Sequence, residues 1–441
     1  MSVAAFGVLS RVAGELGIPA SSLPSPDDLA AVPLPSRLAT GDLASASVSA
    51  VVLASGVDPT LIDGTRVAAA YRSDRLLTLD GSAPSVWSPY SGFWRTGDGW
   101  IRTHGNYPHH AAALVRGLGL PEGTDADALA AVVSRLSTSV ALTRITAAGG
   151  LAVSVDPEDH IADTILRAHP LLDVERVDGA ALARGGSPAG GDGLPLAGIR
   201  VLDLTRVIAG PVATRTLALL GADVLRIDPP LLPEPEWQHL DTGHGKRTAL
   251  LDARSPRMPE LVEAADVVVL GYRPASIARL GLSPADLLAR NPRLIVGQLS
   301  AWGEDRPDAA GFDSLVQASS GISWVESSDG IHPGALPAQA LDHSAGYLLA
   351  AAITALLRKG GHEGRSSVVR TSLRRVAAEL LGMPRRAEPV PDSGSRSATG
   401  STAEPTARFL VDGRRVVTAR SALPGFEFEP PHAWGSDHAR W

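Results

Sequence analysis

The pattern of apolar and polar residues after residue 195 predicts a β-sheet covered by helices. Four apolar runs have the length of strands and lie at 199–204, 222–227, 265–270 and 294–299. The run at 265–270 is almost uninterrupted, which is typical of a strand buried on both faces of a parallel sheet. Helical patterns at 211–220 and after Ser283 separate the runs. Strands that alternate with helices predict a Rossmann-like, doubly wound α/β core.

The first 180 residues follow a different pattern, which predicts a second, smaller α+β domain. The motif Ser-Pro-Asp-Asp at 25–28 predicts a helix start, because Ser is a favoured N-cap, Pro fits the first turn and acids complement the helix dipole. A second helix with a core-facing apolar stripe is expected to begin at Thr124. The expected divisions are 1–180, a Gly- and Pro-rich linker at 181–195, the core at 196–381, and a mobile Pro- and Ser-rich segment with an aromatic tail at 382–441.

Length and composition indicate a globular protein with more than one domain. The chain has 441 residues, 44% of them hydrophobic and 20% charged. A net charge of −7 argues against non-specific binding of nucleic acid. With no cysteine, disulfides, thiolate metal sites and a cysteine nucleophile are excluded. No signal peptide and no apolar stretch long enough to cross a membrane is recognisable, so we expect a cytoplasmic protein without a membrane partner.

Several common catalytic motifs are absent or incomplete. The segment 243–248 hints at a phosphate loop, but Leu240 stands where the first glycine should be and Arg247 follows the lysine. No Gly-x-Gly-x-x-Gly motif follows the first strand, so a nicotinamide or flavin cofactor is not expected. No Gly-x-Ser-x-Gly elbow is present either. His104, His109 and His110 lack metal-ligand spacing on a helix, which favours a polar surface loop and no metal site.

Asp342 is the first candidate for chemistry. It lies where a polar stretch gives way to a long apolar run that is expected to be helical, and small residues follow it. Such a carboxylate can be a nucleophile approached closely by a ligand, and the helix N-terminus would keep it ionised. It can equally be a plain N-cap, since Asp is among the preferred capping residues. The local pattern leaves both interpretations open.

Ordered blocks within the predicted core resemble the class III CoA-transferases, the family of formyl-CoA and carnitine-CoA transferases and of α-methylacyl-CoA racemases. The opening block, Leu-Pro-Leu-Ala-Gly-Ile-Arg-Val-Leu-Asp-Leu-Thr-Arg-Val-Ile-Ala-Gly-Pro, is the most specific of them. The matching blocks lie at 194–211, 219–230, 245–252, 272–274, 279–282, 291–295 and 311–313, and the resemblance ends near Ser372.

The resemblance implies an acyl-CoA:carboxylate CoA-transferase that works through an aspartyl-CoA thioester. Asp342 occupies the place of the family nucleophile, after the Gly-aromatic-Asp block at 311–313. Coenzyme A would enter as acyl-CoA, and a small carboxylic acid would accept it. The alternatives are an isomerase that moves CoA between two carboxyl groups of one molecule, and a non-catalytic CoA-binding subunit that has kept the fold.

The resemblance also implies which residues contact CoA. The loop after the first core strand would lie along CoA, and it comprises Arg206, Val207, Ile208 and Ala209. Arg279 would meet the phosphates or the adenine end. Arg226 and Lys246 are further candidates for phosphate contacts, with a solvated surface cation as the alternative for each. Ligands bind at the carboxyl ends of strands in folds of this kind, which suits the loop.

The chain departs from the family pattern at two places. Phe312 stands where the racemases carry an acid/base histidine, so racemisation is not expected. The segment 93–101 resembles the start of the family's small domain, which ordinarily follows the core, so we expect a rearranged member. The resemblance implies a homodimer. Because only the linker 181–195 joins the two parts, a less interlocked dimer than in the relatives is expected.

Overall fold

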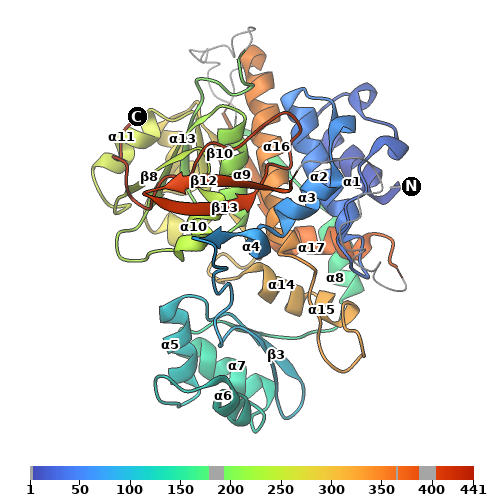
Figure 1. The fold of residues 1–441 in the computed structure, drawn as a ribbon, viewed down its shortest axis with the longest axis vertical. Coiled ribbons are helices and arrows are strands. Elements are labelled where there is room, and N and C mark those ends of the chain that lie inside the picture. Colours follow the sequence, from blue (N-terminus) through green and yellow to red (C-terminus); the bar gives the residue numbers. More distant parts are fainter. Residues whose placement is uncertain (1–2, 178–192, 364–365, 387–403) are drawn as a thin grey trace.

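The chain forms a main body around a seven-stranded sheet, with a small domain below it (Figure 1). The structure is a computed structural model, and it describes residues 3–177, 193–363, 366–386 and 404–441. The sheet order is β5-β11-β10-β9-β6-β7-β8, and every neighbouring pair is parallel except β5 with β11. The strands are β5 (Asp173–Val177), β6 (Arg200–Leu204), β7 (Asp223–Asp228), β8 (Lys246–Leu250), β9 (Val267–Leu270), β10 (Ile295–Ser300) and β11 (Ser366–Ser372).

Helices cover both faces of this sheet, which confirms the predicted doubly wound α/β class. One apolar cluster joins the sheet to α9 (Ala209–Leu219), α14 (Asp313–Ser319), α16 (Ala340–Glu363) and α17 (Leu373–Gly382). A second cluster, on the other face, includes residues of α11 (Arg257–Glu263), α12 (Pro274–Ala278) and α13 (Pro284–Arg290). All four residues of β9 are buried, as its uninterrupted apolar run predicts.

The N-terminal helices belong to the main body. They are α1 (Val3–Glu15), α2 (Thr40–Ser55), α3 (Gly64–Tyr71) and the short α4 (Ser73–Leu76). The helices α1, α2 and α3 share the first apolar cluster with the sheet, and α2 packs along α16 (Figure 1). Nearly every residue of α2 is buried. The predicted unit 1–180 is therefore divided in the structure, because α1–α3 complete the core that the later segments form.

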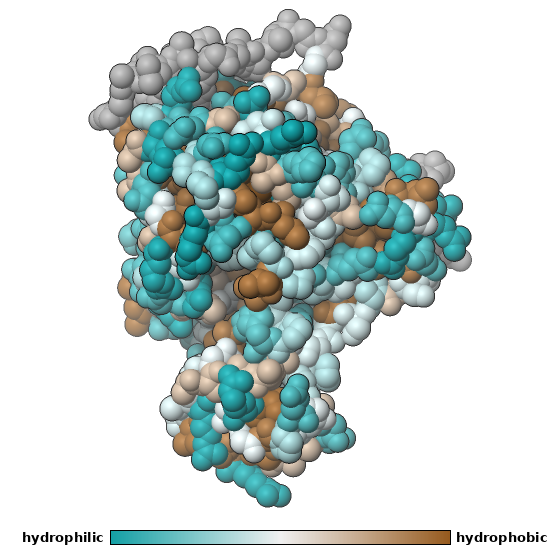
Figure 2. Space-filling view, turned by 90° about the vertical axis from the view of Figure 1, so that its left-hand side faces the viewer, coloured by the Kyte–Doolittle hydropathy of each residue, from teal (hydrophilic) through white to brown (hydrophobic). Residues whose placement is uncertain are grey.

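The small domain is an α+β unit built between residues 86 and 155. Its antiparallel sheet has the order β2-β3-β4 and packs on three helices around a separate apolar cluster. Its elements are β2 (Phe93–Arg95), β3 (Trp100–Thr103), α5 (Pro108–Gly117), α6 (Ala126–Val133), α7 (Thr138–Ala147) and β4 (Ala152–Ser154). Figure 2 shows the narrow waist by which this domain meets the main body.

Two chain segments connect the small domain to the main body. The chain leaves the body after β1 (Thr78–Leu79) and returns in α8 (His160–Ala168), which packs on α17. Two hydrogen bonds join the returning segment to the main body. The Asp156 N–H donates to the carbonyl of Ala318, and the Trp324 ring N–H donates to the carbonyl of Val155. A second connection was missing from the sequence interpretation, which treated 181–195 as the single link. Most of that stretch (178–192) lies outside the described residues.

The aromatic tail folds back on the main body. The strands β12 (Thr406–Val411) and β13 (Arg414–Ala419) form an antiparallel sheet with β1. Phe428 stacks on His244, with the ring centroids 4.7 Å apart. Trp441 donates its ring N–H to the carbonyl of Leu261 and lies near the guanidinium groups of two arginines. The expected mobility of 382–405 concerns mainly 387–403, which also lie outside the described residues.

Some predicted helix signals have a different outcome in the structure. The motif at 25–28 forms only a single 3-10 turn, Pro26–Asp28, because the chain runs on in extended conformation at Leu29. The helix expected at Thr124 is α6, capped by the side chain of Asp125. The helix at Ser283 is α13, and Ser283 and Asp286 form a complete capping box.

The long helix α16 contains a segment that is long and apolar enough to cross a membrane, contrary to the sequence interpretation. The segment is Ala340–Arg358, and 94% of its most apolar 18-residue stretch is buried inside the protein. It is the central helix of the main body, between α2 and α9 (Figure 1).

Candidate active site

A cleft at the junction of the main body and the small domain brings Asp342 together with part of the predicted CoA loop. The loop contributes Val207 and Ile208 to its lining. The lining residues from the small domain and its entry are Val86, Trp87, His104, Asn106 and Tyr107. Those from the main body are Asp74, Val207, Ile208, Trp237, Gln238, Phe312, Asp313, Ser314, Gln339 and Asp342.

Asp342 is the third residue of α16, and another residue caps this helix. The side chain of Asp313 accepts the backbone N–H groups of Leu341 (2.9 Å) and Asp342 (3.0 Å). Gln317 in turn holds the Asp313 carboxylate by a short hydrogen bond. Throughout the described parts of the chain, no hydrogen bond reaches the carboxyl group of Asp342, although only 6% of this residue is exposed. Asp342 therefore lines the cleft without serving as the N-cap.

The pKa values of the two neighbouring carboxyl groups are both raised. Burial raises the pKa of Asp342 well above its ordinary value, and the charge of Asp313 raises it further. Burial also raises the pKa of Asp313 to about 6, against the opposing effect of its hydrogen bonds. The raised pKa runs against the expectation that the helix N-terminus keeps Asp342 ionised, because burial and the charge of Asp313 oppose the effect of the helix dipole. The pair titrates as a unit.

Small residues after Asp342 allow the helix to approach the loop between β6 and α9. A Cβ on Gly346 would lie 2.5 Å from the carbonyl oxygen of Ala209 and 2.9 Å from Cβ of Val212. Only a glycine lets α16 and α9 cross at this distance. The crossing places the start of α16 beside the loop that precedes α9, so the sequence pattern of small residues has a packing cause.

The loop between β6 and α9 contains a strained residue. Val207 has φ of +74°, in the left-handed region that β-branched residues rarely adopt. Ile208 follows as the N-cap position of α9, with φ of −122° and ψ of −57°. Strained backbone of this kind is typical of ligand-binding loops that the surrounding structure holds in place. Ala209, the last residue of the predicted loop, is buried as the first residue of α9.

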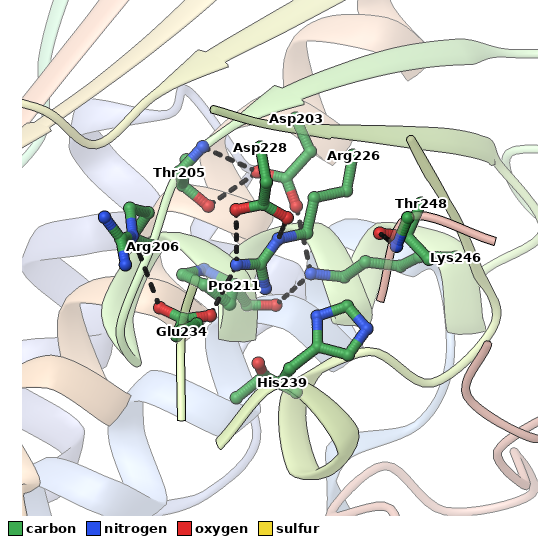
Figure 3. A network of polar contacts seen from close by, with 12 residues as sticks. Asp203, Thr205, Arg206, Pro211, Arg226, Asp228, Glu234, His239, Lys246 and Thr248 are labelled. Carbon is green, nitrogen blue, oxygen red and sulfur yellow. Dashed lines mark hydrogen bonds and ion pairs between the residues drawn. The ribbon is translucent and has the colours of Figure 1, made fainter. Parts of the chain in front are cut away.

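Glu234 holds Val207 in this conformation. Its carboxylate, buried in the body, accepts the N–H of Val207 at 2.5 Å. It also forms an ion pair with Arg226 (Figure 3). The hydroxyl group of Tyr107, from the small domain, donates a hydrogen bond to it at 3.4 Å. The nearby cations lower the pKa of Glu234 despite its burial. This carboxylate therefore joins the loop, the core and the small domain.

Arg226 and Lys246 lie within buried networks of polar contacts, away from solvent (Figure 3). Arg226 pairs with Asp228 and Glu234. Lys246 binds Asp203 (3.0 Å), Thr214 and the carbonyl of Pro211. Their predicted contact with CoA phosphates has no support in this geometry, because a buried, paired cation cannot meet a ligand without breaking its pair. Both alternatives considered for them, phosphate ligand and solvated cation, differ from what the structure shows.

Arg206 and Arg279 lie nearer the surface. The Arg206 guanidinium lies 4.8 Å from the ring centroid of Tyr107 and donates to the carbonyl of Pro233. Arg279 is largely exposed after α12, where it pairs with Asp308 at 3.0 Å. The structure thus leaves the Arg279 guanidinium accessible to a phosphate, but this residue does not line the cleft.

A basic group beside the cleft escaped the sequence interpretation. It comprises Arg206, Arg273, His109 and His110. Burial lowers the pKa of His110 to about 4, and the charges of His109, Arg206 and Arg273 lower it further, so the side chains lie near one another. His109 and His110 begin α5, with their ring centroids 4.1 Å apart. The block at 272–274 contains Arg273, but only the fold brings it to the histidines.

His104 is a further residue whose place in the cleft the sequence reasoning missed. Its ring stacks on Phe312 with a centroid separation of 3.7 Å and an interplanar angle of 6°. Burial lowers its pKa to about 3, so it is a neutral imidazole near pH 7. The prediction of a polar surface loop is wrong for this histidine, because the small domain turns it into the cleft. Within the described segments, no group of residues with metal-binding potential is found.

The fold is a doubly wound α/β fold, and its cleft contains the buried carboxyl group of Asp342 and the strained residue Val207. The model of CoA-transferase family III matches residues 196–407. A "Probable fatty acyl-CoA transferase" of Mycobacterium tuberculosis is 31% identical over 264 residues, which are 53% of this chain and 67% of the relative. The chain belongs to CoA-transferase family III.

Other relatives cover less of their own length. A "Succinate--glutarate CoA-transferase" of Agrobacterium fabrum is 30% identical over 211 residues, which are 42% of this chain and 53% of the relative. A crystal structure of a hypothetical protein from M. tuberculosis has a TM-score of 0.40 and 33% identity, over 43% of this chain and 56% of that one. The chain thus spans about two thirds of the first relative and about half of the others.

Proposed function

We propose that the protein transfers CoA from an acyl-CoA to a carboxylic acid, through a covalent intermediate on Asp342. The observation that carries this proposal is the carboxyl group of Asp342. It lies in the cleft without a hydrogen bond, whereas Asp313 caps the helix. A carboxyl group that is buried at a raised pKa and does no capping is costly for stability, which is expected of a functional residue.

The reaction proceeds by carboxylate exchange. The Asp342 carboxylate attacks the thioester carbonyl, the C–S bond breaks, and a mixed anhydride and a CoA thiolate form. The thiolate attacks the Asp342 carbonyl of the anhydride, which releases the donor acid and leaves an aspartyl-CoA thioester. The acceptor carboxylate then attacks the carbonyl of this thioester, the C–S bond breaks, and a second mixed anhydride and CoA thiolate form. The thiolate attacks the acceptor carbonyl of this anhydride, and the bond to the Asp342 carboxylate breaks. The acceptor leaves as acyl-CoA and Asp342 is free again, without ATP.

CoA is expected to enter along the loop that contains Val207 and Ile208. These two residues line the cleft that contains Asp342. An acyl-CoA that lies along the loop can therefore bring its thioester to the carboxyl group of Asp342. Arg206 and Arg273 of the basic group, together with the exposed Arg279, supply positive charge for the phosphates. The relatives are named for fatty acyl and for dicarboxylic acid substrates, so membership of the family does not select the acyl group.

Substitution of Asp342 tests the proposal. We expect Asp342→Asn and Asp342→Ala to lose at least about 1,000-fold in kcat and to keep their affinity for CoA, since only the nucleophile is removed. Asp125→Asn is the matched control, because Asp125 is a true N-cap, on α6. Because Asn and Asp are about equally good N-caps, this variant is expected to change neither the stability nor the transfer activity appreciably. A folded Asp342→Ala variant with near-normal turnover would contradict the proposal.

The same assay separates the alternatives. An intramolecular isomerase would need Asp342 but would not pass CoA to a second acid in the solution. A CoA-binding subunit would bind CoA and show no turnover in either the original protein or the variants.

A further inference from the structure

One face of the small-domain sheet lies against the main body at the edge of the cleft. Side chains of a strand alternate between its two faces, so Trp100 and Arg102 of β3 and the following His104 lie on one side. The ring of Trp100 contacts that of His332 in the main body, with the centroids 5.6 Å apart. His104 stacks on Phe312. Arg102 therefore lies between two contacts that join the small domain to the main body.

The guanidinium of Arg102 packs on two aromatic rings and lacks an anionic partner. It lies 5.2 Å from the ring centroid of Trp87, which lines the cleft, and 4.8 Å from that of Phe93. Throughout the described parts of the chain, its buried Nε has no hydrogen-bond partner and no carboxylate forms an ion pair with it. Burial lowers its pKa to about 10, so the guanidinium is still charged near pH 7. A largely buried cation with unmet hydrogen bonds is costly for the fold, which is expected where a ligand completes them.

Ser314 supplies a second polar group without a partner, on the lining of the cleft itself. Within the described segments, its Oγ and the Nδ1 of His104 are buried without a hydrogen-bond partner. Ser314 is the second residue of α14, so no carbonyl of its own helix lies one turn before it to accept from the hydroxyl. The helix α14 packs against β3, and the charge of Arg102 acts on Asp313, the residue before Ser314. The hydroxyl and the guanidinium therefore lie on the same side of the cleft.

A carboxylate is the ligand that these groups fit. The Nε and one Nη of a guanidinium together bind both oxygens of one carboxylate, and a hydroxyl adds a further donor. The two rings hold the guanidinium plane, so little side-chain entropy is lost when the ligand binds. The phosphates of CoA are expected at Arg206, which packs on another lining residue, Tyr107. Arg102 is therefore available to an anionic group of the acyl moiety.

We propose that Arg102, assisted by Ser314, binds a second carboxylate on the acyl group, so that the acids joined to Asp342 are dicarboxylic. This inference rests on the proposed function and names its substrate class. The donor and the acceptor acid occupy the same cleft in turn, so both carry the second carboxylate. The reacting carboxyl carbon meets Asp342, and the far carboxylate supplies the partner that the guanidinium lacks.

Pairs of acids of equal chain length provide the direct test on the intact protein. With adipoyl-CoA as the donor, kcat/KM is compared for succinate against butyrate and for glutarate against pentanoate as acceptors. Within each pair a terminal carboxylate replaces a methyl group. We expect the dicarboxylic acid to be used at least about 100-fold more efficiently in at least one pair. Equal use within both pairs, or transfer from hexanoyl-CoA but not from adipoyl-CoA, would overturn the inference while leaving the proposed transfer reaction in place.

Substitution of Arg102 tests the residue itself. In Arg102→Gln we expect kcat/KM to fall at least about 100-fold for the preferred dicarboxylic acid and less than about threefold for its monocarboxylic counterpart. Arg102→Lys keeps the charge and should recover part of the loss, and Ser314→Ala should lower the dicarboxylic preference by about tenfold or less. Arg95→Gln is the matched control that should leave the preference unchanged, because Arg95 packs on Trp100 in the same sheet and is exposed.

Two results with Arg102→Gln would count against the inference. An equal loss for both acids, together with weaker binding of free CoA, would assign Arg102 to a phosphate of CoA. An unchanged preference in the folded variant would assign the guanidinium to the balance of charge around Asp313.

A binding measurement separates this inference from the proposed function. Asp342→Asn is expected to bind adipoyl-CoA with a Kd at least about tenfold lower than that for hexanoyl-CoA. This preference without any transfer by the original protein would contradict the proposed function alone. Equal affinities, or tighter binding of hexanoyl-CoA, would contradict the inference about the acyl group.

Discussion

Two buried carboxyl groups, those of Asp342 and Asp313, lie at the start of α16. We expect the cost of ionising them to lower the free energy of unfolding of the protein. Their pKa values are raised above the unfolded value of 3.8. The folded state therefore binds protons more tightly than the unfolded chain. The penalty is absent below pH 3.8 and grows as the pH rises through the folded pKa values.

Asp342→Asn is accordingly expected to stabilise the protein at pH 8, by an amount on the order of 2 kcal/mol. The gain should shrink as the pH falls towards 4, where both carboxyl groups of the original protein are protonated. Urea unfolding at pH 4, 6 and 8 measures this, with Asp125→Asn as the control that gains nothing. A stability loss at pH 8 would show that the Asp342 carboxylate has a partner that stabilises it.

The same raised pKa predicts how activity depends on pH. Only the ionised carboxylate of Asp342 can attack the thioester. We therefore expect kcat/KM to be low at acidic pH and to rise as the pH passes the pKa of Asp342 in the free enzyme. Because Asp313 carries the neighbouring charge, Asp313→Asn should move the midpoint of this profile to lower pH. A profile that stays flat between pH 5 and 9 in the original protein would argue against an attacking carboxylate with a raised pKa.

Phe312 removes the proton carrier that racemisation needs, and the structure offers poor substitutes. His343 is buried, stacks on Tyr71 at 5.0 Å, and has a pKa lowered to about 3. His104 is nearer to Phe312 but is an equally weak base. We expect no useful exchange of the α-hydrogen of a 2-methylacyl-CoA, as followed by NMR in deuterated water. Rapid exchange that disappears in His104→Gln would overturn this expectation and assign the base.

At the scale of elements, the loop from β6 to α9 is expected to trade stability for ligand binding. Val207→Gly should relieve the left-handed strain and leave the free energy of unfolding equal or higher by about 1 kcal/mol. It should also raise the KM for acyl-CoA, because a more flexible loop is less organised for binding. Denaturant unfolding and initial-rate kinetics test both effects. A variant that is destabilised, with an unchanged KM, would show that the strain has no part in CoA binding.

Elements with a strong local signal were predictable from the sequence. The sequence predicted the strands β6, β7, β9 and β10 from their apolar runs, and the start of α13 from its capping residues. Periodicity, length and capping chemistry are local properties of the sequence. The strand β5 was not recognisable, because its exposed and half-buried residues lack an apolar run and only pairing with β11 at the sheet edge defines it.

The site shows the same limit. Asp342 and the loop at 206–209 were found through motif resemblance, and the structure brings Asp342, Val207 and Ile208 to one cleft. The role of Asp313 as the cap, and the approach of His104 from the small domain, depend on contacts between residues far apart in the chain. The burial of Arg226 and Lys246 is likewise a property of the folded core, so a charged residue in a matching block gave a misleading signal.

At the scale of the molecule, the N-terminal helices complete the main core. The helix α2 packs along α16 and is almost wholly buried, so a truncated chain starting at Gly193 would expose the apolar face of α16. We expect that truncated protein to be insoluble or to aggregate, as judged by light scattering. A soluble, cooperatively folding product would show that residues 1–180 only decorate the core.

The homodimer stays a prediction. Its expected weak interlocking rested on a single link to the small domain, but the structure has two connections, after β1 and before α8. A domain held by two segments can form a ring through which a partner passes, so the interlocked form regains a structural basis. Light scattering on the full chain should give about twice the 45.6 kDa of one chain. A monodisperse monomer at micromolar concentration would refute the dimer.

The most direct test of the central claim is to trap the covalent intermediate on Asp342. The protein is incubated with adipoyl-CoA, treated with hydroxylamine or borohydride, digested, and analysed by mass spectrometry. The account predicts that Asp342 is converted to its hydroxamate or alcohol, that the label requires the acyl-CoA, and that Asp313 beside it is unmodified. An unmodified Asp342 under conditions in which CoA is transferred to an acceptor would contradict the account.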